Sequence, residues 1–217
     1  MTEPTRLIAI RHGETAWNTE HRLQGQLDIP LNPLGRRQAA CLPEALRHEG
    51  LDVVVASDLG RAWETARAFA GPLGLPLLPE PGLRERAFGV MQGHTYEEIE
   101  TRWPDWAARW KARDPDFAAP EGGESLAGFY ARCVATAERV AQAHAGRTVA
   151  LVCHGGVLDC LYRAAARLPL DAPRTWQLGN AAVNRLLHTP QGLTLVGWND
   201  QSHLDGLDDL ALDESST

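Results

Sequence analysis

The chain has 217 residues, enough for one well-buried α/β core. It carries 28 acidic and 21 basic residues, and Lys111 is the single lysine, so Schiff-base chemistry and a lysine-bearing P-loop have almost no place to form. Residues 205–217 hold five acids and no base, which leaves the rest of the chain at about −2 of the formal −7. The absence of a basic stripe and of a long apolar run leads us to expect neither nucleic acid nor a membrane as a partner.

Short apolar runs and amphipathic stretches alternate along the chain. Expected strands cover 6–10, 52–56, 75–78, 148–153, 183–188 and 193–198, the last two as a hairpin, and expected helices cover 34–48, 59–70, 125–145 and 155–167. This alternation predicts an α/β fold with a largely parallel sheet covered by helices on both faces. We expect a single domain over residues 1–204 and a solvated, partly disordered acidic tail over 205–217.

A region from about 88 to 123 interrupts this alternation. Pro104 can begin a helix there and Pro115 can end it. Three tryptophans share one face of that helix and three arginines share another: Trp103, Trp106 and Trp110, and Arg102, Arg109 and Arg113. One interpretation is that the tryptophans pack this insert onto the body while the arginines are solvated. The other is that a small, mostly helical insert acts as a lid over the functional site.

Three expected strands are followed by residues suited to a phosphoryl group. Arg11 and His12 follow the first strand, Arg61 lies in the first turn of the helix after the second, and His154 with Gly155 follows the late strand. Arginine matches phosphate oxygens with a planar fork, and free backbone N–H groups at a helix start favour an anion. Because parallel strands end at one edge of the sheet, we expect these residues to be neighbours.

These residue types can divide the work of phosphoryl transfer. His12 is the candidate in-line nucleophile, for which it must be neutral. A bound dianion and a second histidine are expected to raise the pKa of His12, and the two arginines are expected to offset that rise. A hydrogen bond from the other ring nitrogen would fix the tautomer. Arg11, Arg61 and His154 would stabilise charge on the equatorial oxygens. Glu85 is the candidate general acid and later base; its alternative is a surface carboxylate among arginines.

Several motifs, in this order, resemble the histidine phosphatase superfamily with its phosphoglycerate-mutase-like fold. They are Arg-His-Gly-Glu-Thr-x-Trp-Asn (11–18), Leu-Gln-Gly-Gln-Leu-Asp-Ile-Pro-Leu (23–31), Ser-Asp-Leu-x-Arg-Ala-x-Glu-Thr-Ala (57–66), Leu-Arg-Glu-Arg (83–86), Gly-Gly-Glu-Ser (122–125) and His-Gly-Gly (154–156). The resemblance implies a phosphohistidine on His12 and Glu85 as proton donor. It implies that the phosphate ligands are Arg11, Arg61 and His154. It also implies that three residues border the phosphate or the substrate: Asn18, Gln24 and Gly25.

Within that family, two positions indicate the branch. Cofactor-dependent mutases typically carry His and Tyr where this chain has Ala87 and Phe88, and their insert is longer. The chain therefore resembles the phosphatase branch, which implies a phosphatase of small organic phosphomonoesters with no cofactor. A cofactor-dependent phosphoglycerate mutase and a non-catalytic phospholigand-binding module are the alternatives. The expected partner is the small phosphomonoester substrate, and a homodimer is left open.

Two other hydrolytic chemistries are disfavoured by the sequence. A cysteine phosphatase needs Cys-x5-Arg, but from Cys153 the position of that arginine is occupied by the anion Asp159. The eight histidines are scattered without HExxH, and arginines beside His12 and His154 would oppose a divalent cation, so we expect no metal. The four cysteines lack C-x-x-C pairing and no signal segment is evident, which favours reduced thiols in a cytoplasmic compartment.

Overall fold

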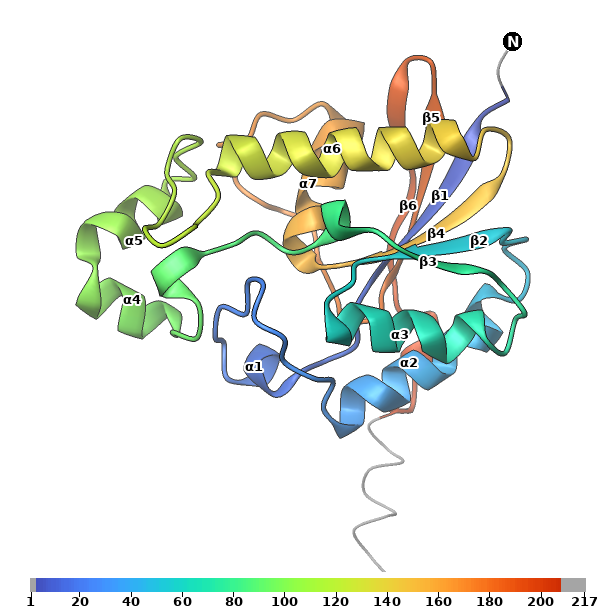
Figure 1. Ribbon diagram of the computed structural model, residues 1–217, viewed down its shortest axis with the longest axis horizontal. Coiled ribbons are helices and arrows are strands. Elements are labelled where there is room, and N and C mark those ends of the chain that lie inside the picture. Colours follow the sequence, from blue (N-terminus) through green and yellow to red (C-terminus); the bar gives the residue numbers. More distant parts are fainter. Residues whose placement is uncertain (1–2, 208–217) are drawn as a thin grey trace, which may run out of the picture.

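A six-stranded sheet forms the centre of the computed structural model, which describes residues 3–207 (Figure 1). The strand order is β3-β2-β4-β1-β5-β6. The strands are β1 (Thr5–Arg11), β2 (Val53–Ala56), β3 (Leu77–Pro79), β4 (Thr148–Cys153), β5 (Val183–Thr189) and β6 (Gly192–Asp200). Strands β3, β2, β4 and β1 pair in parallel, whereas β5 and β6 pair antiparallel. The expected largely parallel sheet is confirmed, with the expected hairpin as its antiparallel edge.

Helices cover both faces of the sheet, as expected. They are α1 (Ala16–Thr19), α2 (Pro33–Leu46), α3 (Gly60–Ala70), α4 (Tyr96–Arg102), α5 (Pro104–Lys111), α6 (Leu126–Ala143) and α7 (Gly155–Ala166). Helices α2 and α3 lie on one face, and α6 and α7 lie on the other (Figure 1). Short 3-10 turns occupy Pro81–Leu83, Gly89–Met91 and Ser202–Leu204. Residues 208–217 of the expected acidic tail lie outside the described residues.

Two helices were not predicted from the sequence. Helix α1 lies within the expected polar loop, where the Thr15 hydroxyl and the Asn18 side chain cap one short turn. Helix α4 begins with a capping box formed by Thr95 and Glu98, a signal that was present in the sequence. Helix α5 begins at Pro104, as expected, but it ends at Lys111, before Pro115.

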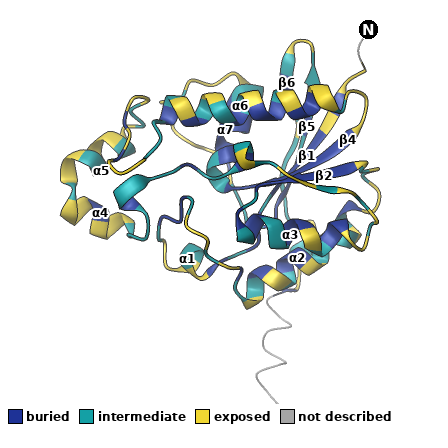
Figure 2. Cartoon of the chain, in the orientation of Figure 1, coloured by how far each residue is buried: buried dark blue, intermediate teal, exposed yellow. Residues whose placement is uncertain are grey.

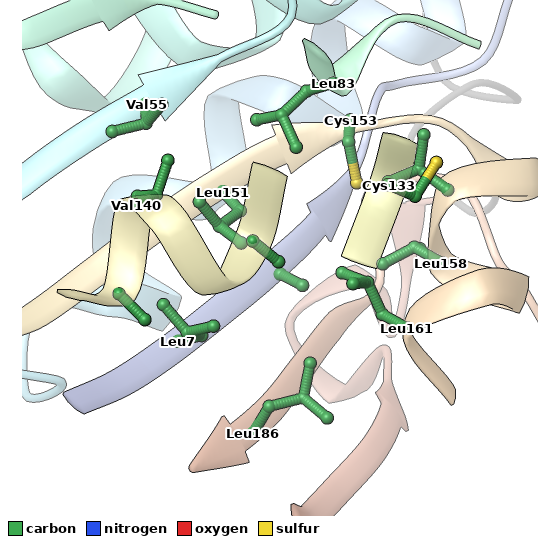
Figure 3. Packing of buried hydrophobic residues seen from close by; sticks show 14 of the residues in the cluster. Leu7, Val55, Leu83, Cys133, Val140, Leu151, Cys153, Leu158, Leu161 and Leu186 are labelled. Carbon is green, nitrogen blue, oxygen red and sulfur yellow. The ribbon is translucent and has the colours of Figure 1, made fainter. Parts of the chain in front are cut away.

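Strand side chains alternate between two apolar layers. In β1, Leu7 and Ala9 face the layer under α6 and α7, whereas Ile8 and Ile10 face α2 and α3. Figure 3 shows the first layer, in which leucine side chains of the strands meet those of α7. The inner strands are buried along their length (Figure 2). Each fully buried aliphatic side chain contributes about 1.5–3 kcal/mol, so these layers hold the strand ends in fixed register.

The insert has a small apolar cluster of its own. Helices α4 and α5 lie at one end of the molecule, away from the sheet, and much of their surface is exposed (Figures 1 and 2). Buried side chains from the insert gather with Leu23 of the first loop: Met91, Ile99, Ala107, Phe117 and Ala119. The tryptophans pack mainly inside this cluster; the Trp103 and Trp106 ring centroids are 5.3 Å apart. The tryptophans thus pack on a cluster that consists mostly of insert residues and that includes Leu23 from outside the insert.

The arginines of the insert are also not simply solvated. Arg102 lies over the Trp103 ring, and Arg109 pairs with Asp114 at 2.7 Å. Arg113, just beyond α5, pairs with a carboxylate of α7. Arg102 and Arg109 are nevertheless exposed, as one interpretation expected, whereas Arg113 is half-buried.

Candidate active site

A pocket of about 830 Å³ lies at the carboxyl ends of β1 and β4. Arg11 and Cys153 are register partners at the ends of these strands, and the His12 amide donates to the Cys153 carbonyl at 3.0 Å. The sheet edge, the insert and the segment 173–180 enclose this space. All but one of the candidate residues line it: Arg11, His12, Asn18, Gln24, Gly25, Arg61, Glu85 and Gly155. The exception, His154, is fully buried beside the pocket.

His12 is held as a neutral imidazole with one nitrogen free. Its Nδ1 lies 2.7 Å from the Gly13 carbonyl oxygen, which can only accept, so the ring proton is on Nδ1. No residue within 3–207 bonds Nε2, and the side chain is 3 % exposed at the pocket. Burial first, then the charges of Arg61 and Arg11, holds the pKa of His12 well below its ordinary value. The Nε2 lone pair is therefore available at neutral pH.

His154 lies beside His12, with ring centroids 5.2 Å apart. Its Nε2 is 2.8 Å from the Ser57 hydroxyl, which also accepts from the Leu59 amide at 3.4 Å. The hydroxyl can donate to Nε2 or accept from it, and Nδ1 is buried without a partner among residues 3–207. Burial and the Arg61 charge hold the pKa of His154 well below its ordinary value. The expectation that a second histidine raises the pKa of His12 is wrong: His154 is held neutral, and a positive charge on its ring would lower the pKa of His12 instead.

Arg61 is buried and Arg11 is half-buried, and each has a buried Nε–H group without a protein partner. Arg61, 1 % exposed, donates to the Leu27 and Gly25 carbonyls at 2.8 and 2.7 Å, and Arg11 donates to the Leu178 carbonyl. Neither Nε has a partner among the described residues. Burial lowers the pKa of Arg61 to about 10, so it stays charged at neutral pH. An unpaired buried donor costs about 1–3 kcal/mol, so each of these two groups is held at an energetic cost.

Glu85 reaches the pocket from the chain that follows β3. Its Oε1 accepts from the Arg86 amide at 2.8 Å, and its Oε2 accepts from the Gly156 amide in the first turn of α7 at 2.9 Å. A Cβ at Gly156 would lie 2.2 Å from Oε1, so this position has room for the carboxylate only as glycine. The Glu85 carboxylate is thus tied to the same helix start that follows His154.

The three residues implied only by the resemblance lie around the pocket in different ways. Asn18 Oδ1 accepts from the Thr15 amide at 3.0 Å. Gln24 is 8 % exposed, and its Oε1 has no partner among residues 3–207. Gly25 has φ +52, and its carbonyl holds Arg61 at 2.7 Å. Asn18 and Gly25 therefore support the pocket wall through backbone and side-chain bonds.

Several residues in or next to the pocket were not predicted. Ser57 and Gly156 lie inside the motifs at 57–66 and 154–156. Sequence spacing gave no sign that Ser57 bonds His154 or that Gly156 bonds Glu85. Asn180 donates to the His12 carbonyl at 3.0 Å. Another group lies in or beside a loop without motif or periodicity, so no local signal could have found it: Arg174, Trp176 and Leu178.

Other site chemistries receive no support from side-chain placement. Burial raises the pKa of the Cys153 thiol, which keeps it protonated and unreactive. Within residues 3–207, no three His, Cys, Asp or Glu side chains converge in a way that could hold a metal ion. In the same range no helix is both long enough and apolar enough to cross a membrane.

Known proteins share this fold and these motifs. The model of the histidine phosphatase superfamily (branch 1) matches residues 7–201. Phosphoglycerate mutase-like protein 4 of Arabidopsis thaliana is 38 % identical over 202 residues, or 92 % of this chain and 86 % of the relative. The structure of Bacillus stearothermophilus YhfR is similar with TM-score 0.84 and 32 % identity, over 93 % of this chain and 100 % of its own. A mycobacterial glucosyl-3-phosphoglycerate phosphatase gives 0.81 and 33 %, over 92 % and 100 %.

This chain belongs to the histidine phosphatase superfamily, as the motifs predicted, and it has the phosphoglycerate-mutase-like fold. The names of its relatives divide between mutase and phosphatase. Family membership therefore fixes the class of protein and leaves the reaction to be argued from the site.

Proposed function

We propose that this protein is a phosphatase that hydrolyses small organic phosphomonoesters through a phosphohistidine on His12. The observation that carries the proposal is the state of this side chain: a buried, neutral imidazole with Nδ1 bonded to Gly13 and Nε2 open to a pocket that Arg11 and Arg61 also line. A neutral nitrogen can attack phosphorus, and the two guanidiniums can stabilise the charge on the equatorial oxygens.

The reaction then has two displacement steps. In the first, the Nε2 lone pair of His12 forms a bond to phosphorus, the ester P–O bond breaks, and protonated Glu85 gives its proton to the leaving alkoxide. In the second, the Glu85 carboxylate takes a proton from water, whose oxygen attacks phosphorus while the N–P bond breaks. Inorganic phosphate leaves, and His12 and Glu85 return to their starting states. Arg11, Arg61, His154 and the helix start at Gly155 are the proposed phosphate ligands.

The outer pocket supports a leaving group with an apolar or sugar part. Phe88 packs against Trp110 with ring centroids 5.8 Å apart, and Tyr96 stacks on the same indole at 4.8 Å. Phe88 offers no polar group to a second phosphate, and neither does Ala87. This favours a phosphatase over a cofactor-dependent phosphoglycerate mutase, although relatives carry mutase names.

The phosphoenzyme provides the decisive test. Rapid quenching after incubation with a labelled phosphomonoester should trap an acid-labile, alkali-stable phosphoprotein, and His12→Ala should abolish it. His48→Ala is a matched control, because His48 is exposed in the turn after α2 and does not line the pocket. Label on serine or cysteine, or label that persists in His12→Ala, would contradict the proposal.

A panel of phosphorylated metabolites separates the alternatives. The proposal requires release of phosphate without 2,3-bisphosphoglycerate, and EDTA should leave that activity intact. Fast interconversion of 2- and 3-phosphoglycerate that depends on 2,3-bisphosphoglycerate would establish the mutase instead. Tight binding of phosphorylated compounds with no turnover of any would favour the non-catalytic module.

We also propose a cytoplasmic location. All four cysteines are unpaired, and Cys133, Cys153 and Cys160 are buried, which suits a compartment that keeps thiols reduced. Fractionation of cells that express the tagged protein, with detection by immunoblot, would check this.

A further inference from the structure

Asp159 of α7 is a buried carboxylate that lies between two arginines from different parts of the molecule. Its Oδ2 accepts from Arg163 Nε at 2.9 Å and from Arg113 Nη2 at 2.8 Å. Arg163 is on the same helix and is fully buried, whereas Arg113 belongs to the insert, just beyond α5. The same carboxylate oxygen thus joins the insert to the helix whose start lines the phosphate side of the pocket.

The two arginines also hold the loop that follows α7. Arg163 Nη1 donates to the Pro169 carbonyl at 2.7 Å, and Arg113 Nε donates to the Leu170 carbonyl at 2.6 Å. The Arg163 guanidinium lies 4.8 Å from the centroid of the Trp176 ring, and Trp176 lines the pocket. This loop leads to Leu178, whose carbonyl accepts from Arg11.

Arg113 also has an unusual backbone conformation. Its φ is +54, in the left-handed region that a residue with a Cβ adopts at an energetic cost. Surrounding contacts must maintain such a conformation, and the side chain of Arg113 makes two of them, both outside the insert. Arg113 is therefore both the residue at which the insert turns back toward α7 and the residue that binds the insert to α7.

We propose that Asp159 is a positioning residue, which fastens the insert through Arg113 and the 168–178 loop through Arg163 and so sets the shape of the leaving-group side of the pocket. The effect on leaving-group selection rests on the proposed phosphatase function, whereas the effect on the insert does not. Asp159 itself does not line the pocket, so it acts only through the segments that it holds.

The first measurement is hydrogen exchange of the full-length protein without substrate. Arg113→Gln removes the link to the insert at a side chain that is 24 % exposed, and it leaves the Asp159–Arg163 pair intact. Amide exchange in peptides over 104–117 should become about tenfold faster, the effect of losing one charge-assisted hydrogen bond, while peptides of β4 keep their rates. Arg36→Gln is the matched control, because it removes one ion pair, with Glu64, outside the insert and should leave exchange over 104–117 unchanged.

The second measurement compares two substrates with good leaving groups of different size. For Arg113→Gln, kcat/KM with p-nitrophenyl phosphate should fall about tenfold, mainly through KM, and kcat/KM with acetyl phosphate should change less than about threefold. Because Arg113 lines the pocket, a direct contact with substrate must be separated from positioning. In an Asp159→Asn background, Arg113→Gln should add little if it acts through Asp159, and its full effect if it binds substrate directly.

Each outcome decides the proposal. Unchanged exchange over 104–117 in Arg113→Gln would overturn it, as would an equal loss of kcat/KM with both substrates or additive effects in the double variant. Asp159→Asn leaves the Arg163 cation buried without a counter-charge; if that variant does not fold, exchange and kinetics of Arg113→Gln against Arg36→Gln still decide. A wild-type protein that hydrolyses no phosphomonoester would refute the proposed function, while the exchange result would still test the role of Asp159.

Discussion

The Gly156 amide donates a 2.9 Å hydrogen bond to Oε2 of Glu85, although 71 positions of sequence separate the two residues. This bond brings the candidate proton donor to the first turn of α7, directly after His154. The missing side chain of Gly156 is what makes room, since a Cβ there would lie 2.2 Å from Oε1 of Glu85 and 3.0 Å from a ring carbon of Phe129.

Gly156→Ala should therefore displace the Glu85 carboxylate. We expect kcat for alkyl phosphates, whose alkoxides need a proton, to fall about 10²-fold or more, because general acid catalysis contributes that much. Hydrolysis of p-nitrophenyl phosphate, whose leaving group needs little protonation, should fall much less. Steady-state kinetics on both substrates check this.

Gly155→Ala is the matched control for that substitution. A Cβ at this position would lie 3.5 Å from Arg11 Nε, an ordinary contact distance, so Glu85 keeps its place. Equal losses with alkyl and nitrophenyl substrates in Gly156→Ala would contradict the assigned role of Glu85.

The free energy of unfolding should fall as the pH drops below about 6.5. His12 and His154 have pKa values well below the ordinary value in the folded protein, and near 6.5 in the unfolded chain. Below pH 6.5 the unfolded chain binds protons that the folded protein does not, so stability present above this pH is lost. Urea unfolding between pH 7.5 and 5 should give a slope of about two to three protons, since burial also lowers the pKa of His203, and about one proton less in His154→Asn. An unchanged slope in that variant would show that His154 titrates normally.

Ser57→Ala should weaken phosphate binding without touching the pocket. The Ser57 hydroxyl lies 2.8 Å from His154 Nε2, and its loss frees the imidazole to change tautomer. We expect kcat/KM to fall roughly five- to tenfold, the effect of one hydrogen bond. Nitrogen-15 NMR of the histidine rings should show the tautomer change. Ser202→Ala, which removes an exposed hydroxyl bonded to Asp200, should alter neither quantity.

Arg61→Lys should be far from conservative. The guanidinium spans two carbonyls, of Leu27 and Gly25, and still presents Nε, which a lysine ammonium cannot reproduce. We expect kcat/KM to fall about 10²–10³-fold, as when one preorganised donor is removed. Arg36→Lys changes an exposed arginine paired with Glu64 and should retain full activity. Activity within tenfold of wild type in Arg61→Lys would argue against a phosphate contact.

Arg174 should attract the substrate through its charge. It is exposed at the pocket, has no ion pair or hydrogen bond among residues 3–207, and its charge lowers the pKa of Arg11. Arg174→Gln should raise KM about threefold at low salt, and the difference should vanish at 0.5 M salt because of screening. Arg167→Gln, on the far end of α7, should behave as wild type. A salt-independent loss would indicate a direct contact instead.

Much of the fold could be predicted because its signals are local. Strand β4 has the predicted bounds, since a β-branched apolar run has one way to be buried on both faces. Helix α4 was not predicted, although Thr95 and Glu98 form a capping box at its start. The prediction placed one helix in the insert, between Pro104 and Pro115. The weak strand 75–78 occurs as β3, shifted to 77–79, where pairing with β2 decides its ends.

The sequence by itself determined the order of strands and helices, the candidate residues at the strand ends, and the family. Each of these follows from a periodicity or a motif that a short stretch of chain contains. The tertiary structure decided which groups meet: Ser57 with His154, Gly156 with Glu85, and Arg113 with Asp159. It also decided that His12 is neutral, because burial and the approach of two cations depend on segments far apart in the chain.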